Sequence, residues 1–150
     1  MKILLIEDNA CEADLTREAL REAGISHELF VVEDGEAATD FLRREGVHAN
    51  AAMPNIVLLD LNLPRKCGRE VLAEIKGDRL LCRIPVIVVS NSQAIDDIDA
   101  VYQLGGNSYL VKSGDLDEYF VSVKALVEFW MRRARLPSVA SDGHQPALLP

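Results

Sequence analysis

The sequence predicts an α/β fold, a doubly wound five-stranded parallel sheet with helices on both faces. Five short apolar runs recur along the chain, and such runs are typical of strands that are buried on both faces. Between them lie segments in which apolar residues repeat at helical spacing. Strands and helices therefore alternate, which is the pattern of successive βα units in a parallel sheet.

The five apolar runs are the predicted strands. They cover residues 2–7, 27–32, 55–60, 85–90 and 108–112. Right-handed crossovers leave few arrangements of five parallel strands, and the usual one is the flavodoxin-like order 2-1-3-4-5. In that order the winding direction reverses between the first and third strands, and ligands bind at the carboxyl ends of the strands there.

Five amphipathic segments are the predicted helices. They cover residues 9–23, 35–44, 68–76, 94–104 and 115–134. Gly24 is placed to end the first helix, because glycine readily takes the left-handed conformation found after helix C-termini. Asp115 and Glu118 stand in capping-box spacing at the start of the last helix.

Length and composition predict one acidic globular domain. The chain has 150 residues, of which 49% are hydrophobic and 27% charged, enough to bury a core. Its formal net charge is −8, which argues against nucleic acid or an anionic membrane as partner because both need a cationic surface. We expect the domain to cover residues 1–136 and the Pro/Ser/Ala-rich segment 137–150 to be a disordered tail.

The lack of targeting signals in the sequence and the spacing of its cysteines predict a cytoplasmic protein. No apolar run approaches the roughly 18 residues of a membrane-spanning helix, and no cleavage site follows the first apolar run. Cys11, Cys67 and Cys82 are widely spaced with no C-x-x-C pair, which favours free thiols in a reducing compartment.

Acidic residues gather at the predicted reversal of winding. The first strand leads into Glu7 and Asp8, and the third strand ends in Asp60. Neighbouring carboxylates repel one another, and a divalent cation relieves this repulsion; Mg²⁺ is favoured because it prefers oxygen ligands and accepts phosphate as a further ligand. Any one of these residues alone is more often a turn or cap residue, but three at adjacent strand ends indicate a functional site.

Two further strand ends carry groups that suit phosphate. The fourth strand stops at Ser90 and the fifth runs into Lys112. A hydroxyl and an ammonium facing the carboxylates are the parts that bind a phosphoryl group whose oxygens also touch Mg²⁺. Taken singly, Ser90 is more often a helix cap and Lys112 a solvated lysine, so their shared location carries the prediction.

These residues resemble the receiver domain of two-component response regulators. The resemblance spans residues 1 to about 134 and rests on the motifs ILLIEDN, LLDLNLP, PVIVVS and SYLVKS. Serine stands at position 113, where the family usually has a proline after the lysine. More narrowly, the stretches LPRKCGREVLAEIKGD and CRIPVIVVSNS are similar to the stand-alone regulators paired with bacterial phytochromes.

The resemblance implies a role for each residue of the acidic site. Asp60 is expected to accept a phosphoryl group from a sensor histidine kinase. Glu7, Asp8 and Asp60 are expected to hold Mg²⁺ together with the backbone carbonyl of Asn62. Lys112 is expected to contact the phosphoryl oxygens.

The resemblance also implies a conformational switch and partners. Ser90 is expected to be the switch hydroxyl and Tyr109 the switch aromatic, which together reshape the surface of the fourth helix, fifth strand and fifth helix. As a plain alternative, Tyr109 is a half-buried strand aromatic. The similarity to phytochrome-associated regulators implies a bacteriophytochrome kinase as partner.

The last helix carries apolar residues beyond one core stripe. Tyr119, Leu126 and Phe129 lie on a face adjacent to its inner stripe. A homodimer or a kinase-docking face explains this excess. A wide core face covered by the tail explains it equally well.

Three other functions are weighed against this one. A flavin-binding electron carrier shares the topology but needs a phosphate-cradling loop after the first strand, where this chain has EDNACE. A receiver that never takes phosphate is disfavoured because the acceptor, metal and lysine positions are all filled. A phosphatase with an aspartate nucleophile usually has a second aspartate where this chain has Asn62. We therefore expect a phosphoacceptor signalling protein, which promotes its own phosphorylation and dephosphorylation but is not an enzyme in the ordinary sense.

Overall fold

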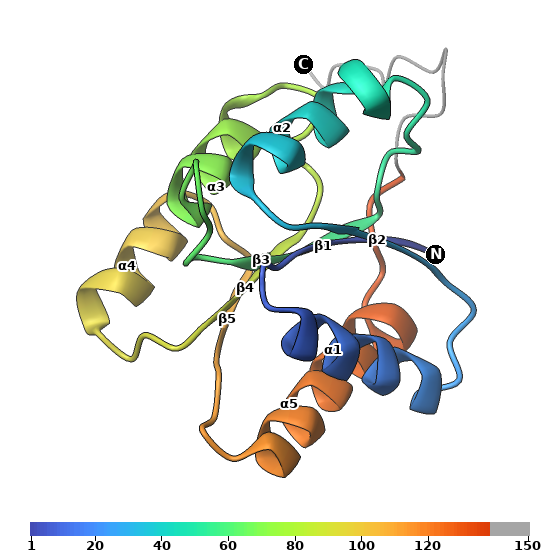
Figure 1. Ribbon diagram of the computed structural model, residues 1–150, viewed down its shortest axis with the longest axis vertical. Coiled ribbons are helices and arrows are strands. Elements are labelled where there is room, and N and C mark those ends of the chain that lie inside the picture. The colour runs from blue at the N-terminus through green and yellow to red at the C-terminus, as the bar shows by residue number, and fades with distance from the viewer. Residues whose placement is uncertain (139–150) are drawn as a thin grey trace.

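The computed structural model describes residues 1–138 and contains one five-stranded parallel sheet (Figure 1). In chain order, the elements are β1 (Lys2–Ile6), α1 (Ala10–Glu22), β2 (Glu28–Val32), α2 (Gly35–Arg43), η1 (Gly46–His48), β3 (Ile56–Asp60), α3 (Gly68–Gly77), β4 (Val86–Ser90), α4 (Ile95–Gln103), β5 (Ser108–Val111), α5 (Leu116–Glu128) and η2 (Phe129–Arg133), a π-helical continuation of α5. The strand order is β2-β1-β3-β4-β5. This confirms the predicted doubly wound fold. Of the segment 137–150, which was predicted to be a tail, residues 139–150 lie outside the described part of the chain.

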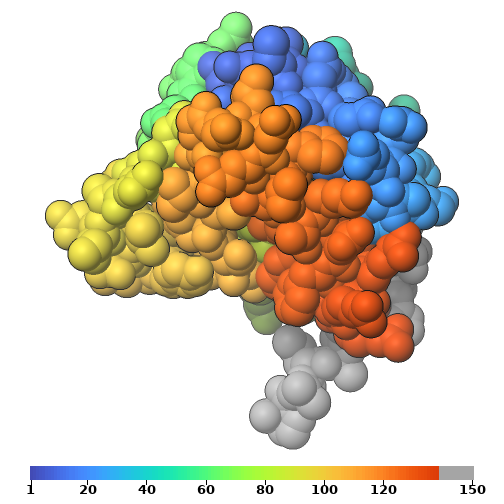
Figure 2. Space-filling model, turned by 90° about the horizontal axis from the view of Figure 1, so that it is seen from below, coloured from blue at the N-terminus to red at the C-terminus, as the bar shows by residue number. Residues whose placement is uncertain are grey.

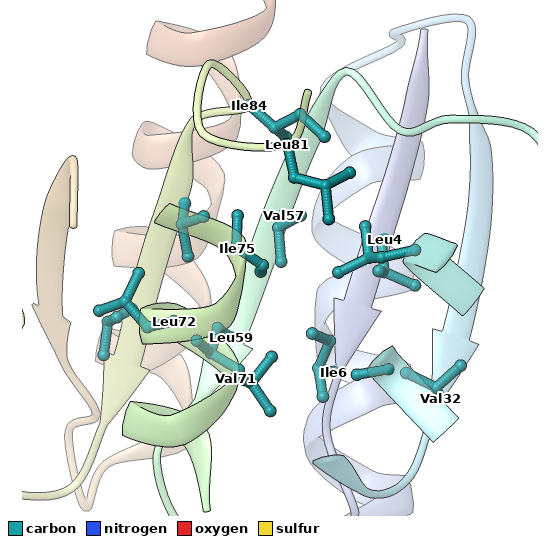
Figure 3. Packing of buried hydrophobic residues seen from close by; sticks show 14 of the residues in the cluster. Leu4, Ile6, Val32, Val57, Leu59, Val71, Leu72, Ile75, Leu81 and Ile84 are labelled. Carbon is teal, nitrogen blue, oxygen red and sulfur yellow. The ribbon is translucent and has the colours of Figure 1, made fainter. Parts of the chain in front are cut away.

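The helices cover the sheet in two layers (Figure 1). α1 and α5 lie on one face, and α2, α3 and α4 lie on the other. Alternate residues of a strand point to opposite faces, so Leu4 and Ile6 of β1 enter the core under α2 and α3 (Figure 3). Ile3 and Leu5 enter the core under α1 and α5. Because both faces are covered, the central strands are apolar along almost their whole length.

The first helix begins directly at the carboxyl edge of the sheet. The side chain of Asn9 accepts hydrogen bonds from the backbone N–H groups of Cys11 and Glu12, at 2.9 and 3.2 Å, which satisfies two donors that a helix start leaves free. At the other end, Gly24 has a φ of +63°, the left-handed conformation expected of a residue that ends a helix. The first turn of α1 is therefore held beside the ends of β1 and β3.

The start of α3 packs closely against the end of β3. The N–H of Gly68 donates to the carbonyl oxygen of Leu61 at 3.0 Å. A Cβ atom at position 68 would lie 2.3 Å from the carbonyl oxygen of Asp60, a distance that no side chain tolerates. Glycine at this position therefore lets the chain turn tightly after Asp60.

The last helix has a wide buried face. Tyr119, which helical spacing places on a face adjacent to the inner stripe, is buried with Val123 and Val127 against the sheet and α1. Of the two explanations left open by the sequence, a wide core face therefore accounts for Tyr119, whereas Phe129 is exposed. Within the described residues, no helix is both long and apolar enough to cross a membrane.

Candidate functional site

The sheet brings the three predicted carboxylates to one place. β1 and β3 are neighbours with Ile6 opposite Leu59, so the residues that follow them meet at the carboxyl edge. Glu7, Asp8 and Asp60 each offer a carboxylate oxygen, and these oxygens all lie within 4.8 Å of one another. Glu7 and Asp60 are buried, whereas Asp8 is exposed.

The three carboxylates together fit a small divalent cation. Mg²⁺ binds oxygen ligands at about 2.1 Å, so opposite ligands lie about 4.2 Å apart, which is close to the 4.8 Å limit within which the three oxygens lie. The exposed Asp8 leaves one side of the site open to water, which Mg²⁺ usually keeps as a ligand. Two of the three carboxylates are buried beside a single lysine, so negative charge is in excess and favours a cation.

Lys112 reaches this cluster from the end of β5. Its Nζ lies 2.9 Å from Glu7 Oε2 and 2.8 Å from Asp60 Oδ2, and its side chain is only 3% exposed. Burial lowers the pKa of Lys112, but hydrogen bonds to Asp60, Glu12 and Glu7 outweigh burial and raise this pKa above its ordinary value. The lysine is therefore a fixed positive charge. It points at Asp60, and Ser113 is the residue that follows it.

Backbone N–H groups fix the two buried carboxylates. The N–H of Asn62 donates to Asp60 Oδ1 at 2.9 Å, so each oxygen of Asp60 has a partner on its own side. The N–H of Asn9 donates to Glu7 Oε1 at 3.0 Å. Burial raises the pKa of Glu7 to about 7 despite its hydrogen bonds to Lys112 and Asn9, because a carboxylate removed from water is less stable in its charged form.

Ser90 and Tyr109 meet at the loop after β4. Ser90 is fully buried, and its Oγ accepts a hydrogen bond from the N–H of Ser92 at 3.2 Å. The half-buried Tyr109 donates its hydroxyl to the carbonyl oxygen of Ser92 at 2.9 Å. Both predicted switch residues thus form hydrogen bonds with this loop. Ser90 ends β4, the strand next to that of Asp60, and Tyr109 lies on β5, one strand further along the sheet.

Comparison with known proteins decides the family. Residues 3–124 match the response regulator receiver domain. The chain belongs to this family. Response regulator Rcp1 from Synechocystis sp. is 46% identical over 136 residues, which span 91% of this chain and 92% of Rcp1.

Solved receiver structures share the fold of this receiver domain. The crystal structure of the Mn²⁺-bound form of Rcp1 has a TM-score of 0.89 and covers 91% of this chain and 99% of that one. The phosphorylated cyanobacterial phytochrome response regulator RcpA is 51% identical, with a TM-score of 0.88 and coverage of 91% and 98%. The chain is therefore a phosphorelay signalling protein, and it is similar to a phytochrome response regulator.

One residue of this receiver site was not predicted from the sequence. Glu12, in the first turn of α1, forms an ion pair with Lys112. An acidic residue in a first turn is ordinary, because it complements the positive end of the helix dipole, so Glu12 gave no separate signal. Only the structure shows that this first turn starts at the acidic site and brings Glu12 to Lys112.

Proposed function

We propose that Asp60 accepts a phosphoryl group from a sensor histidine kinase and that phosphorylation then changes a protein-binding surface. The observation that carries the proposal is the 2.8 Å contact between Lys112 Nζ and Asp60 Oδ2 beside the carboxylates of Glu7 and Asp8. Phosphoryl transfer needs a fixed nucleophile and positive charge around the transferred group. Lys112 and a cation held by the acidic residues provide that charge.

The proposed reaction is a direct transfer to the aspartate. A carboxylate oxygen of Asp60 attacks the phosphorus of a phosphohistidine, the P–N bond breaks, and its electron pair stays with the imidazole. The backbone N–H of Asn62 orients Asp60, and Lys112 donates to the phosphoryl oxygens. Glu7, Asp8, Asp60 and the backbone carbonyl of Asn62 would hold Mg²⁺, which would supply further charge neutralisation. Attack by water on the phosphoryl group later restores the free carboxylate.

Phosphorylation is proposed to act through Ser90 and Tyr109. The new phosphoryl oxygens are strong acceptors and draw the Ser90 hydroxyl towards them, which breaks its bond to the N–H of Ser92. The loop then changes shape, and Tyr109 moves with it. The affected surface is that of α4, β5 and α5, where Ile95, Tyr102 and Leu116 are exposed; part of this surface, with α5 between α1 and α4, is seen in Figure 2.

The proposed kinase partner is a bacteriophytochrome. The support is the similarity to RcpA, a phytochrome response regulator. A cytoplasmic location goes with this proposal, because free Cys11, Cys67 and Cys82 suit a reducing compartment. Neither nucleic acid nor membrane is a proposed partner, since the net charge of −8 repels both.

A homodimer through the last helix is proposed as well. Two large apolar side chains are exposed here: Val121 on α5, and Phe129, which directly follows the end of α5. Large apolar side chains on one helix favour association. Sedimentation of the wild type and of Val121→Asp tests this. We expect a dimer that the substitution weakens; a wild-type monomer at high concentration would contradict the proposal.

A mass measurement tests the phosphoacceptor. Wild type incubated with acetyl phosphate and Mg²⁺ should gain one phosphoryl group, and chelation of Mg²⁺ should abolish the gain. Asp60→Asn should remain unmodified, whereas Asp40→Asn, which changes an exposed aspartate of α2, should behave as wild type. Modification of Asp60→Asn to the same extent would overturn the assignment.

A further inference from the structure

The donors of Lys112 are fully used in the unphosphorylated site. An ammonium group has three N–H donors and no acceptor. Those of Lys112 reach Glu7, Asp60 and Glu12. If Lys112 is to bind an incoming phosphoryl oxygen, one of these three carboxylates must give up its contact.

Glu7 and Asp60 are poorly placed to give up their contacts with Lys112. Until the new bond to phosphorus forms, Asp60 Oδ2 stays beside Lys112, because the N–H of Asn62 holds the other oxygen of Asp60. Glu7 is buried and is held through Oε1 by the N–H of Asn9. A movement of Glu7 would break that second bond inside the protein, where water does not replace it.

Glu12 is the carboxylate that can leave. Its side chain is 22% exposed, so water can solvate it after release. Among the described residues, Lys112 is the only hydrogen-bond or ion-pair partner found for the Glu12 carboxylate. The helix that carries it stays in place, because the cap at Asn9 and the bond from Thr16 Oγ to the Glu12 carbonyl involve backbone atoms.

We propose that Glu12 is a displaceable counter-ion of Lys112, which competes with the phosphoryl group for the lysine. This inference rests on the proposed phosphorylation of Asp60. Before transfer, Glu12 neutralises Lys112 and places a negative charge beside the path of an anionic phosphoryl group. After hydrolysis of the phosphoryl group, Glu12 pairs with Lys112 again. Glu12 is thus a positioning residue that opposes the phosphorylated state.

The opposite role predicts an opposite result. If Glu12 acted only as a clamp that aims Lys112 at Asp60, its removal would misplace the lysine and weaken binding of a phosphoryl group. Competition predicts tighter binding, because Glu12→Gln keeps the size of the side chain and removes the charge. The sign of the change therefore separates the two roles.

Equilibrium binding of beryllofluoride, a stable mimic of the phosphoryl group on a carboxylate, tests the proposal. With Mg²⁺ present, we expect Glu12→Gln to bind it about two- to fivefold more tightly than wild type, the range for loss of a partly exposed ion pair. Phosphorylation by acetyl phosphate should become faster by a similar factor. The matched control is Glu18→Gln, which removes the same charge from a half-exposed position of α1 that pairs with Arg21; it should bind as wild type does.

The outcomes are distinct. Unchanged or weaker beryllofluoride binding in Glu12→Gln, with normal binding by wild type, would overturn the counter-ion role and leave the phosphoacceptor role standing. Equal tightening in Glu18→Gln would also overturn it, since net charge would then explain the effect. A wild type that binds no beryllofluoride with Mg²⁺ would overturn both proposals.

Discussion

Lys112 Nζ lies 2.8 Å from Asp60 Oδ2, although 52 residues separate the two along the chain. Asp60 ends β3 and Lys112 directly follows β5, with β4 between them. The lysine therefore extends along the carboxyl edge of the sheet to reach the aspartate. Because parallel strands end at one edge, the fold itself creates this contact.

Replacement of Lys112 should greatly slow phosphorylation. Lys112→Met keeps a long apolar stem but removes the charge that faces the phosphoryl oxygens, and loss of one such donor slows a reaction by roughly a hundredfold or more. The rate of mass gain with acetyl phosphate measures this. Lys124→Met, which removes a surface lysine paired with Glu22, is the control. A Lys112→Met protein that is folded, as judged by circular dichroism, and as fast as wild type would contradict the role of Lys112.

Most of the site was predictable because strand ends define it. A strand buried on both faces leaves an uninterrupted apolar run in the sequence, so the polar residues that follow it stand out. Glu7, Asp60 and Lys112 could thus be assigned to one edge once the strand order was known. The helix faces were harder to predict, since α5 is apolar on several sides and only packing shows that Tyr119 is buried.

Glu12 could not be found from the sequence for a different reason. Its contact with Lys112 joins residues 100 positions apart and depends on how far one side chain reaches from the first turn of α1. Neither periodicity nor spacing encodes that reach. The bond from the Tyr109 hydroxyl to the carbonyl oxygen of Ser92 likewise depends on how far a side chain reaches.

Mg²⁺ should stabilise the protein through Asp8. A ligand that binds only the folded state at ten times its dissociation constant adds about 1.4 kcal/mol to the free energy of unfolding. Thermal unfolding with and without Mg²⁺ should show this gain in wild type, and Asp8→Asn should lose most of it. Because Asp8 is exposed, the substitution leaves the core intact. An equal loss in Asp14→Asn, on the exposed side of α1, would show that general charge and not a specific site is responsible.

The metal-free protein should become less stable as the pH rises towards neutrality. Burial raises the pKa of Glu7 from 4.5 to about 7, so the folded state holds this proton more tightly than the unfolded state. The stabilising contribution is fully present below pH 4.5 and is lost as the pH rises through about 7. The loss is on the order of 3 kcal/mol in the free energy of unfolding.

Urea unfolding without metal, from about pH 5 to about pH 8, measures this loss as a falling midpoint. Glu7→Gln should remove the fall, because glutamine does not titrate, whereas Glu28→Gln, at an exposed end of β2, should keep it. A midpoint that rises over this range in wild type would contradict the assignment. Mg²⁺ affinity should change in the opposite sense and increase with pH, since the cation competes with the proton on Glu7.

Removal of the Tyr109 hydroxyl should loosen the loop after β4. Tyr109→Phe keeps the ring but loses the hydrogen bond to the carbonyl oxygen of Ser92, a bond worth about 1 kcal/mol. If local opening of this loop breaks that bond, amide hydrogen exchange at residues 91–94 should become about fivefold faster. Tyr102→Phe, which changes an exposed tyrosine of α4, should leave the exchange unchanged. Equal exchange in all three proteins would mean that the hydroxyl does not hold the loop, and Tyr109 would then be only a half-buried aromatic of the sheet.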